Sequence, residues 1–157
     1  MFGGAKWVAV VILGVFILAG CDTNSSSSRS IETMSSVNAV RHNDPTKIAR
    51  GQQVYLQYCA SCHGDKAQGA PNWRQKGTDG LFPPPPLNGF GHAWRHSTAA
   101  LREMIKDGSP PGQGKMPAWG GKLSDQDIDA VIAWFQSLWP DAVYGEWFAM
   151  EQRSFGR

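Results

Sequence analysis

The sequence predicts a helical fold in which long irregular stretches separate three short helices. Apolar residues recur at the i, i+3, i+4 spacing of an amphipathic helix in three segments, which follow Asp44, Ser97 and Ser124. Asp and Ser are residue types that commonly cap helix N-termini. The stretches between these segments are rich in proline and glycine, which interrupt regular structure.

Length and composition fit one domain with a tail or two. The chain has 157 residues, of which 41% are hydrophobic and 18% are charged. These proportions are typical of an ordinary soluble globule once a targeting segment is set aside. The formal net charge of +2 is too small to indicate nucleic acid or an anionic membrane surface as a partner.

The first 20 residues predict an export signal. Lys6 supplies a positive charge, and residues 7–18 form an apolar run that is shorter than the roughly 20 residues of a membrane-spanning helix. The Leu-Ala-Gly sequence before Cys21 resembles the lipobox of bacterial lipoproteins, which predicts cleavage before this cysteine and lipidation of it. Asp22 favours retention at the inner membrane. A non-lipidated leader and an uncleaved anchor remain alternatives.

Residues 21–43 begin with the predicted lipidated cysteine and continue as a predicted flexible tether. Their composition is rich in Ser, Asn and Thr, with few bulky apolar side chains. From Asp22 to Asn43, such a tether has a relaxed length of roughly 25 Å and stretches to about 75 Å. We therefore expect the folded domain to move over a membrane surface without leaving it.

The first predicted helix begins at Pro45, with Asp44 as its N-cap. Ile48, Gly51 and Tyr55 follow at helical spacing. Because Gly51 and Tyr55 lie one turn apart, the glycine can admit a closely packed partner helix while the tyrosine covers the contact. Alternatively, the glycine has no packing role and is merely tolerated within the helix, where it costs about 1 kcal/mol of stability relative to alanine.

The chain's most specific motif is Cys59-Ala-Ser-Cys62-His63. Cys-x-x-Cys-His is the attachment signature of c-type haem, in which the two thiols bind the haem vinyl groups and the histidine ligates the iron. A thioredoxin-like redox pair would require a strand before the motif, where the sequence predicts a helix. A zinc site would require four ligands. The motif therefore predicts one covalently bound haem c.

A proline run in the irregular stretch predicts the hydrogen-bond partner of this histidine. Residues 83–86 are four prolines, which have no amide N–H but retain free carbonyl acceptors. A metal-ligating histidine normally donates its other ring N–H to such an acceptor. We predict that His63 donates to the carbonyl of Pro85 or, failing that, of Pro86. The alternative is that the proline run only makes the loop rigid and does not contact His63.

The second and third predicted helices have clear boundaries. Ser97 caps the second, which runs to Lys106, and Gly108 follows its end. Ser124 begins the third, and Asp127 completes a capping box. The third helix carries an apolar stripe and ends before Pro140. The stripe consists of Leu123, Ile128, Val131, Ile132, Phe135 and Leu138.

The second axial ligand of the iron is predicted to be Met116. Met34 lies in the tether, Met150 lies in the tail, and Met104 lies on an apolar helix stripe that predicts a place in the core. Met116 lies in a loop braced by Pro117 and glycines, where a side chain can be aimed inward. A thioether ligand is associated with a raised potential and electron transfer. A filled sixth position also argues against chemistry on a substrate.

His92 and His96 are four residues apart and would share one face of a helix, where they could hold a second metal such as copper. Surface or haem-propionate hydrogen bonding is the alternative. Trp73, Arg74 and Trp94 are further candidate propionate donors, with a structural role as the alternative for the two tryptophans. The tail, residues 141–157, is aromatic and is expected to fold back on the domain. The alternative is that the tail forms a surface on which a partner protein docks.

Several of these features together resemble a class I monohaem cytochrome c. They are the Cys-x-x-Cys-His motif at 59–63, the Pro-Leu-Asn-Gly stretch at 86–89, the Met-Pro pair at 116–117, and the predicted first and last helices. The resemblance covers residues 44–140. The lipobox, the tether and the extra tail depart from ordinary members and indicate a bacterial lipoprotein variant.

The resemblance implies an all-α, class I cytochrome c fold, with a few helices and long irregular loops around one covalently bound haem. It also implies histidine and methionine ligation of the iron. Gly51 and Tyr55 are expected to meet the last helix near Ile132 and Phe135.

The sequence as a whole predicts a membrane-tethered, periplasmic electron carrier rather than an enzyme. Its expected partners are redox proteins that donate and accept electrons, together with the membrane to which the lipid attaches. No nucleic acid and no small-molecule substrate is expected. A haem subunit of a larger oxidoreductase or terminal oxidase is the main alternative. A haem-based sensor or a copper-handling protein is a more distant one.

Overall fold

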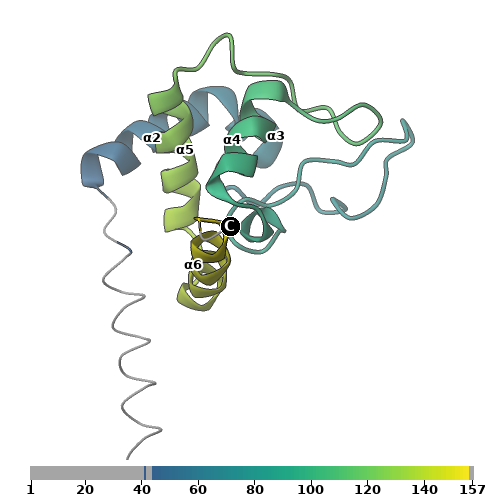
Figure 1. Cartoon of the computed structure of the whole chain (residues 1–157). Helices are drawn as coiled ribbons and strands as arrows, with labels where there is room; N and C mark the ends of the chain where they lie inside the picture. The colour runs from purple at the N-terminus through teal and green to yellow at the C-terminus, as the bar shows by residue number, and fades with distance from the viewer. Residues whose placement is uncertain (1–40, 42–43, 156–157) are drawn as a thin grey trace, which may run out of the picture. The chain divides into compact units, whose positions relative to one another are not determined.

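A computed structural model describes residue 41 and residues 44–155 of the chain (Figure 1). The predicted export signal, Cys21 and all of the predicted tether except Arg41 lie outside the described residues. The described part contains helices and no strand, which confirms the all-α prediction. None of these helices is long and apolar enough to span a bilayer. They are α2 (Pro45–Tyr58), α3 (Ala60–His63), the 3-10 helix η1 (Ala93–Arg95), α4 (Thr98–Asp107), α5 (Asp125–Ser137) and α6 (Asp141–Phe155).

The predicted N-caps are present in the structure. The Asp44 carboxylate accepts the backbone N–H of Thr46 at 2.9 Å, and Pro45 occupies the first turn of α2. The Ser97 hydroxyl caps α4. At α5, Ser124 and its partner three residues on form the predicted capping box. Because each cap satisfies backbone N–H groups that a helix leaves unpaired, the helices begin where the local sequence predicts.

Helices α2 and α5 cross in close contact at Gly51. A Cβ atom at this position would lie 2.0 Å from the carbonyl oxygen of Ala130 and 2.8 Å from the Cβ of Trp134. Tyr55, one turn later and fully buried, packs on Trp134 with ring centroids 4.2 Å apart. Gly51 therefore has a packing role, because a larger residue would separate the two helices.

The crossing point on α5 differs from the predicted one. The predicted contacts, Ile132 and Phe135, are buried, but Gly51 meets Ala130 and Trp134 instead. Positions 130 and 134 lie one turn apart on one face of α5, and at 100° per residue position 132 lies on a different face. The hydrophobic stripe identifies which residues are buried but not which neighbour each one meets.

We expect Gly51→Ala to destabilise the protein. Overpacking costs about 1–3 kcal/mol, which the better helix propensity of alanine offsets by about 1 kcal/mol. Chemical denaturation of the haem-loaded protein measures the change. Gly121→Ala is the matched control, because no atom lies within 4 Å of a Cβ placed there. Equal stability of the two variants would contradict the close crossing.

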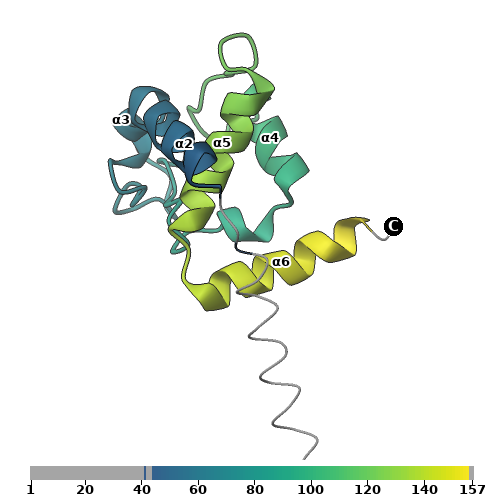
Figure 2. The same cartoon turned by 90° about the vertical axis from the view of Figure 1, so that its left-hand side faces the viewer.

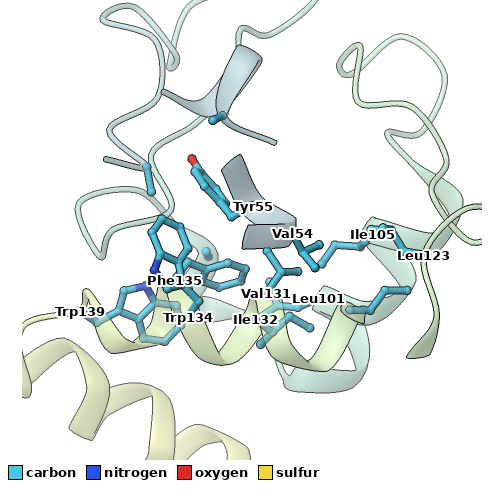
Figure 3. Packing of buried hydrophobic residues seen from close by; sticks show 14 of the residues in the cluster. Val54, Tyr55, Leu101, Ile105, Leu123, Val131, Ile132, Trp134, Phe135 and Trp139 are labelled. Carbon is cyan, nitrogen blue, oxygen red and sulfur yellow. The ribbon is translucent and has the colours of Figure 1, made fainter. Parts of the chain in front are cut away.

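The core lies between α2, α4 and α5 (Figure 3). Two buried residues of α4, Leu101 and Ile105, contribute to it from one face of that helix. An ion pair between Lys106 and Asp125, at 2.7 Å, lies at the exposed edge of the contact between α4 and α5. The most deeply buried large side chains of the cluster are Trp139, Tyr55, Ile128 and Val131.

The aromatic tail forms α6 and folds back on the domain, as expected. In Figure 2, α6 runs across the lower end of α5. The indole N–H of Trp147 donates to the carbonyl of His96 at 3.2 Å. The buried carboxylate of Glu151 accepts the backbone N–H of Thr98 at 3.1 Å. A carboxylate at a helix N-terminus is favourable, so α6 contributes a cap to α4.

Arg41 connects the N-terminal part of the described chain to the beginning of α6. Its guanidinium forms an ion pair with Asp141 and donates to the carbonyl of Trp139. The same group lies 4.7 Å from the ring centroid of Tyr144. Arg41 is therefore held beside the beginning of α6.

Candidate functional site

The structure places both motif cysteines and the motif histidine on a single helical turn. His63 N–H donates to the carbonyl of Cys59 at 2.9 Å, which closes α3. Cys59 is half-buried and Cys62 is exposed, and both are free thiols. Burial and, secondarily, the neighbouring Cys62 raise the pKa of the Cys59 thiol to about 11.

His63 is buried, and its ring orientation is fixed by the proline segment. The ring Nδ1 lies 2.9 Å from the carbonyl oxygen of Pro85, the partner that the sequence predicts. A carbonyl can only accept, so Nδ1 must carry the proton and donate it to this bond. Burial lowers the pKa of His63, and the bond to Pro85 opposes this effect. The imidazole is thus favoured in its neutral form, with the Nε2 lone pair free for a metal.

Several hydrogen bonds hold the proline segment in place. The carbonyl of Pro84 accepts the N–H of Ala70 at 2.9 Å, and the carbonyl of Ala67 accepts the N–H of Leu87 at 2.8 Å. On the other side, the indole N–H of Trp139 donates to the carbonyl of Leu87 at 2.7 Å. These bonds flank Pro85 on both sides, so its carbonyl is held in position to accept from His63.

Gly69 is required for this close approach. A Cβ atom here would lie 2.4 Å from the nitrogen of Pro86 and 2.5 Å from the carbonyl carbon of Pro85. Its φ of +68° also lies in the left-handed region that favours glycine. The backbone of Gly69 donates to the carbonyl of His63 at 2.7 Å. The loop after the motif and the proline segment therefore form one packed unit around His63.

The Met116 loop folds back against the end of α4. Ser109 holds Met116 twice: its backbone N–H donates to the Met116 carbonyl at 2.9 Å, and its hydroxyl accepts the Met116 N–H at 3.3 Å. Further along, the N–H of Trp119 donates to the carbonyl of Ile105 at 3.0 Å. The Met116 side chain is half-buried and packs against the core.

An aromatic contact joins the two segments that carry the predicted axial ligands. Tyr58, directly before Cys59, packs edge to face with Trp119, three residues after Met116, with ring centroids 5.4 Å apart. The Lys122 ammonium lies 5.5 Å from the Tyr58 ring centroid and 5.6 Å from that of Trp119. The haem-attachment motif and the Met116 loop thus border the same part of the molecule.

The prediction from the sequence that Met104 lies in the core is wrong. Its side chain is 40% exposed, whereas Leu101 and Ile105 are buried. Leu101 and Ile105 lie one turn apart on the face of α4 that meets α5, and Met104 lies off that stripe. Burial therefore does not exclude Met104 as an iron ligand, and a direct test must include it.

His92 and His96 do not share a helix face. They flank η1, and their rings lie 5.6 Å apart, edge to face. His92 stacks on Trp73 at 5.4 Å, and Arg74 lies 4.4 Å from the same indole. Within residue 41 and residues 44–155, no group of three or more His, Cys, Asp or Glu side chains is placed to hold a metal ion. The pair by itself supplies two ligands.

Two residues that build the site were not found from the sequence. Ala67, fully buried, has a φ of +55° and accepts the bond from Leu87. No sequence signal distinguishes an alanine in this conformation. The second is Ser109, whose only signal is its place after the helix-ending Gly108 and before Pro110. Both act through contacts with residues that are distant in the sequence.

The family comparison decides the class of this domain. The model of the family described as cytochrome C oxidase, cbb3-type, subunit III matches residues 46–135. The chain belongs to this family. It is a class I c-type cytochrome domain, and the fold class and the covalently bound haem c that the sequence predicts are confirmed. The general function of such a domain is electron transfer.

Relatives of known name are similar to the same part of the chain. A cbb3-type cytochrome c oxidase subunit CcoP from Azospirillum sp. (strain B510) is 37% identical over 95 residues, covering 60% of this chain and 30% of the relative. A thiosulfate dehydrogenase from Stutzerimonas stutzeri (strain A1501) is 38% identical, covering 57% and 27%. A cytochrome c6 from Picosynechococcus sp. (strain ATCC 27264 / PCC 7002 / PR-6) is 31% identical, covering 55% and 68%.

The chain thus spans less than a third of the length of the first two relatives. No solved structure matches it.

The residues present fit a haem c group. Two free thiols lie on one turn beside a buried histidine whose Nδ1 proton is already committed to Pro85. A bound haem supplies one-electron exchange between ferric and ferrous iron. The chain's own contribution is to fix the orientation of His63 and to hold the loop that carries Met116.

Proposed function

We propose that this protein is a membrane-tethered, periplasmic electron carrier in which His63 and Met116 are the axial ligands of one haem c. Cys59 and Cys62 provide the covalent attachment. The observation that carries the proposal is the hydrogen bond from His63 to Pro85, and the bond from Met116 to Ser109, which holds the methionine loop, supports it. Two protein ligands leave no open coordination position, so the domain exchanges electrons with partner proteins rather than acting on a substrate.

Rigid ligand positioning suits electron transfer. Backbone hydrogen bonds tie the Met116 loop to α4 and to the segment that leads into the proline run. When packing and hydrogen bonds fix the ligands, the reorganisation energy that accompanies a change in the charge of the iron is small. A ligand-binding sensor, by contrast, requires a position that opens readily.

The anchoring part of the proposal rests on the sequence around Cys21. Lipidation there would keep the domain near membrane-bound donors and acceptors and raise its effective concentration at their surfaces. Arg41 supports a defined exit point for the tether, because it fixes the chain beside α6. Asp22 favours the inner membrane.

Cys21→Ser tests the anchor. We expect the variant to move from the membrane fraction to the soluble periplasmic fraction and to lose incorporation of labelled fatty acid. Its haem content and absorption spectrum should match the wild type, because Cys21 precedes the folded domain. Fractionation and labelling after expression in a bacterial host measure both properties. Unchanged membrane retention in the variant would contradict a lipid anchor at this cysteine.

A second candidate function is a haem subunit of a larger oxidoreductase or terminal oxidase. The family match and the relatives named as oxidase subunits favour it. Affinity purification from detergent-solubilised membranes, followed by redox titration, separates the two candidates. A carrier is expected to purify alone with one titrating centre. A subunit is expected to bring further redox centres in fixed proportion.

A further inference from the structure

Two irregular loops, distant in the sequence, contact each other beside the site. One is the segment Lys76–Phe82, which lies within the long stretch after the haem-attachment motif. The other is the loop 109–115, which leads into Met116. Phe82 donates its backbone N–H to the carbonyl of Gln113 at 2.9 Å. Figure 1 shows these two loops, teal and green, on the same side of the molecule.

Side chains add two further contacts between the loops. The Asp79 carboxylate pairs with the Lys115 ammonium at 2.5 Å, and Lys115 directly precedes Met116. The Lys76 ammonium donates to the carbonyl of Gly112 at 3.4 Å. Together with the Phe82 bond, these contacts are spread over residues 112–115, so they hold the loop over much of its length.

The segment that makes these contacts is itself folded. The N–H of Gly77 donates to the carbonyl of Leu81 at 2.8 Å, and the N–H of Leu81 donates to the Asp79 carboxylate at 3.0 Å. The segment continues directly into the proline run that holds Pro85 against His63. It is therefore tied to the histidine side of the site at one end and to the methionine loop along its length.

The loop 109–115 needs such support. Residues 110–113 are exposed, and an exposed Pro- and Gly-containing loop is ordinarily mobile. Ser109 holds Met116 at the inner end of the loop. The contacts with Lys76–Phe82 are made at residues 112, 113 and 115, so movement of the loop requires that they break.

We propose that the segment Lys76–Phe82 is a positioning element that keeps the Met116 thioether on the iron by restraining the loop 109–115. The proposal rests on the proposed ligation by Met116. It assigns a role to part of the irregular stretch between the haem-attachment motif and the proline run. The segment acts by lowering the frequency with which the loop opens.

Phe82→Pro against Phe82→Ala is the principal test. Both variants remove the half-exposed side chain, but only proline removes the N–H that donates to Gln113. Proline is compatible with this position, because the residue before Pro83 is already biased toward extended backbone. The measurement is the rate at which carbon monoxide binds to the reduced protein, since it can bind only when the sixth position is free.

We expect carbon monoxide to bind Phe82→Pro about three- to tenfold faster than Phe82→Ala, the change that corresponds to one lost hydrogen bond. Equal rates in two folded variants would overturn the proposal. Thermal unfolding of both haem-loaded variants shows that they are folded.

A second pair of variants tests the element without a backbone change. Asp79→Asn removes the ion pair to Lys115, and Asp125→Asn removes the similarly exposed ion pair to Lys106. We expect Asp79→Asn to increase the carbon monoxide rate about two- to fivefold at low salt, and less at high salt, where surface pairs are screened. Asp125→Asn should leave the rate unchanged. The same increase in both variants would indicate a general loss of stability and would overturn the specific role.

Failure of this proposal is distinguishable from failure of the ligand assignment. If Met116→Ala leaves the spectrum of the ferric protein unchanged, the assignment of Met116 is wrong and the proposal falls with it. If Met116→Ala changes the spectrum while Phe82→Pro and Asp79→Asn bind carbon monoxide at the rates of their controls, the assignment of Met116 as the ligand is retained. In that case the positioning role of Lys76–Phe82 is wrong.

Discussion

Met116→Ala is expected to abolish the sulfur-to-ferric-iron charge-transfer band and to lower the reduction potential. A thioether favours ferrous iron, and alanine leaves that position to water or to another weak ligand. We expect a fall on the order of 0.1–0.2 V, a modest part of the roughly 0.8 V range over which axial ligands set haem potentials. Absorption spectroscopy of the ferric protein and a redox titration measure the two effects.

Met104→Ala is the matched control. Met104 is 40% exposed, so the structure does not exclude it by burial. The expected result is an unchanged band and an unchanged potential. If the band survives in Met116→Ala and disappears in Met104→Ala, the ligand comes from α4 and the proposed ligand pair is wrong.

Gly69→Ala is expected to raise the potential and to destabilise the protein. The added Cβ would push the proline segment away and weaken the bond from His63 to Pro85. That bond makes the imidazole a stronger donor, which favours ferric iron, so its loss shifts the potential in the opposite direction from Met116→Ala. Left-handed strain and overpacking together cost about 2–4 kcal/mol. Redox titration and chemical denaturation measure the two effects.

Gly80→Ala separates backbone strain from contact. Gly80 has a φ of +74°, close to that of Gly69, but no atom lies within 4 Å of a Cβ placed there. This variant should lose only the strain contribution of about 1–2 kcal/mol. It should not raise the potential, because the bond from His63 to Pro85 is left intact. If Gly69→Ala behaves in the same way, contact with the proline segment does not control His63.

Local sequence features predicted much of the fold. The caps at Asp44, Ser97 and Ser124 act on residues two or three positions away, so they can be identified from the sequence alone. The hydrogen-bond partner of His63 could also be predicted from the sequence, although it lies 22 residues away. Consecutive prolines lack N–H groups, so they offer free acceptors beside a histidine that needs one.

Contacts between elements could not be predicted in the same way. Helical periodicity marks which residues of α5 are buried, but the crossing with α2 selects Ala130 and Trp134 through the shapes of both helices. Met104 falls near an apolar stripe but outside the face that meets α5. The contacts of Glu151 with α4 and of Asp79 with Lys115 join distant segments, and no local pattern indicates either one.

The reaction of the reduced wild-type protein with carbon monoxide tests the central claim most directly. A carrier in which His63 and Met116 occupy both axial positions should bind carbon monoxide slowly, at a rate that levels off with concentration because loop opening limits it. Fast binding that rises in proportion to the carbon monoxide concentration would mean that the sixth position is open. That result would contradict the electron-carrier account and favour a haem-based sensor.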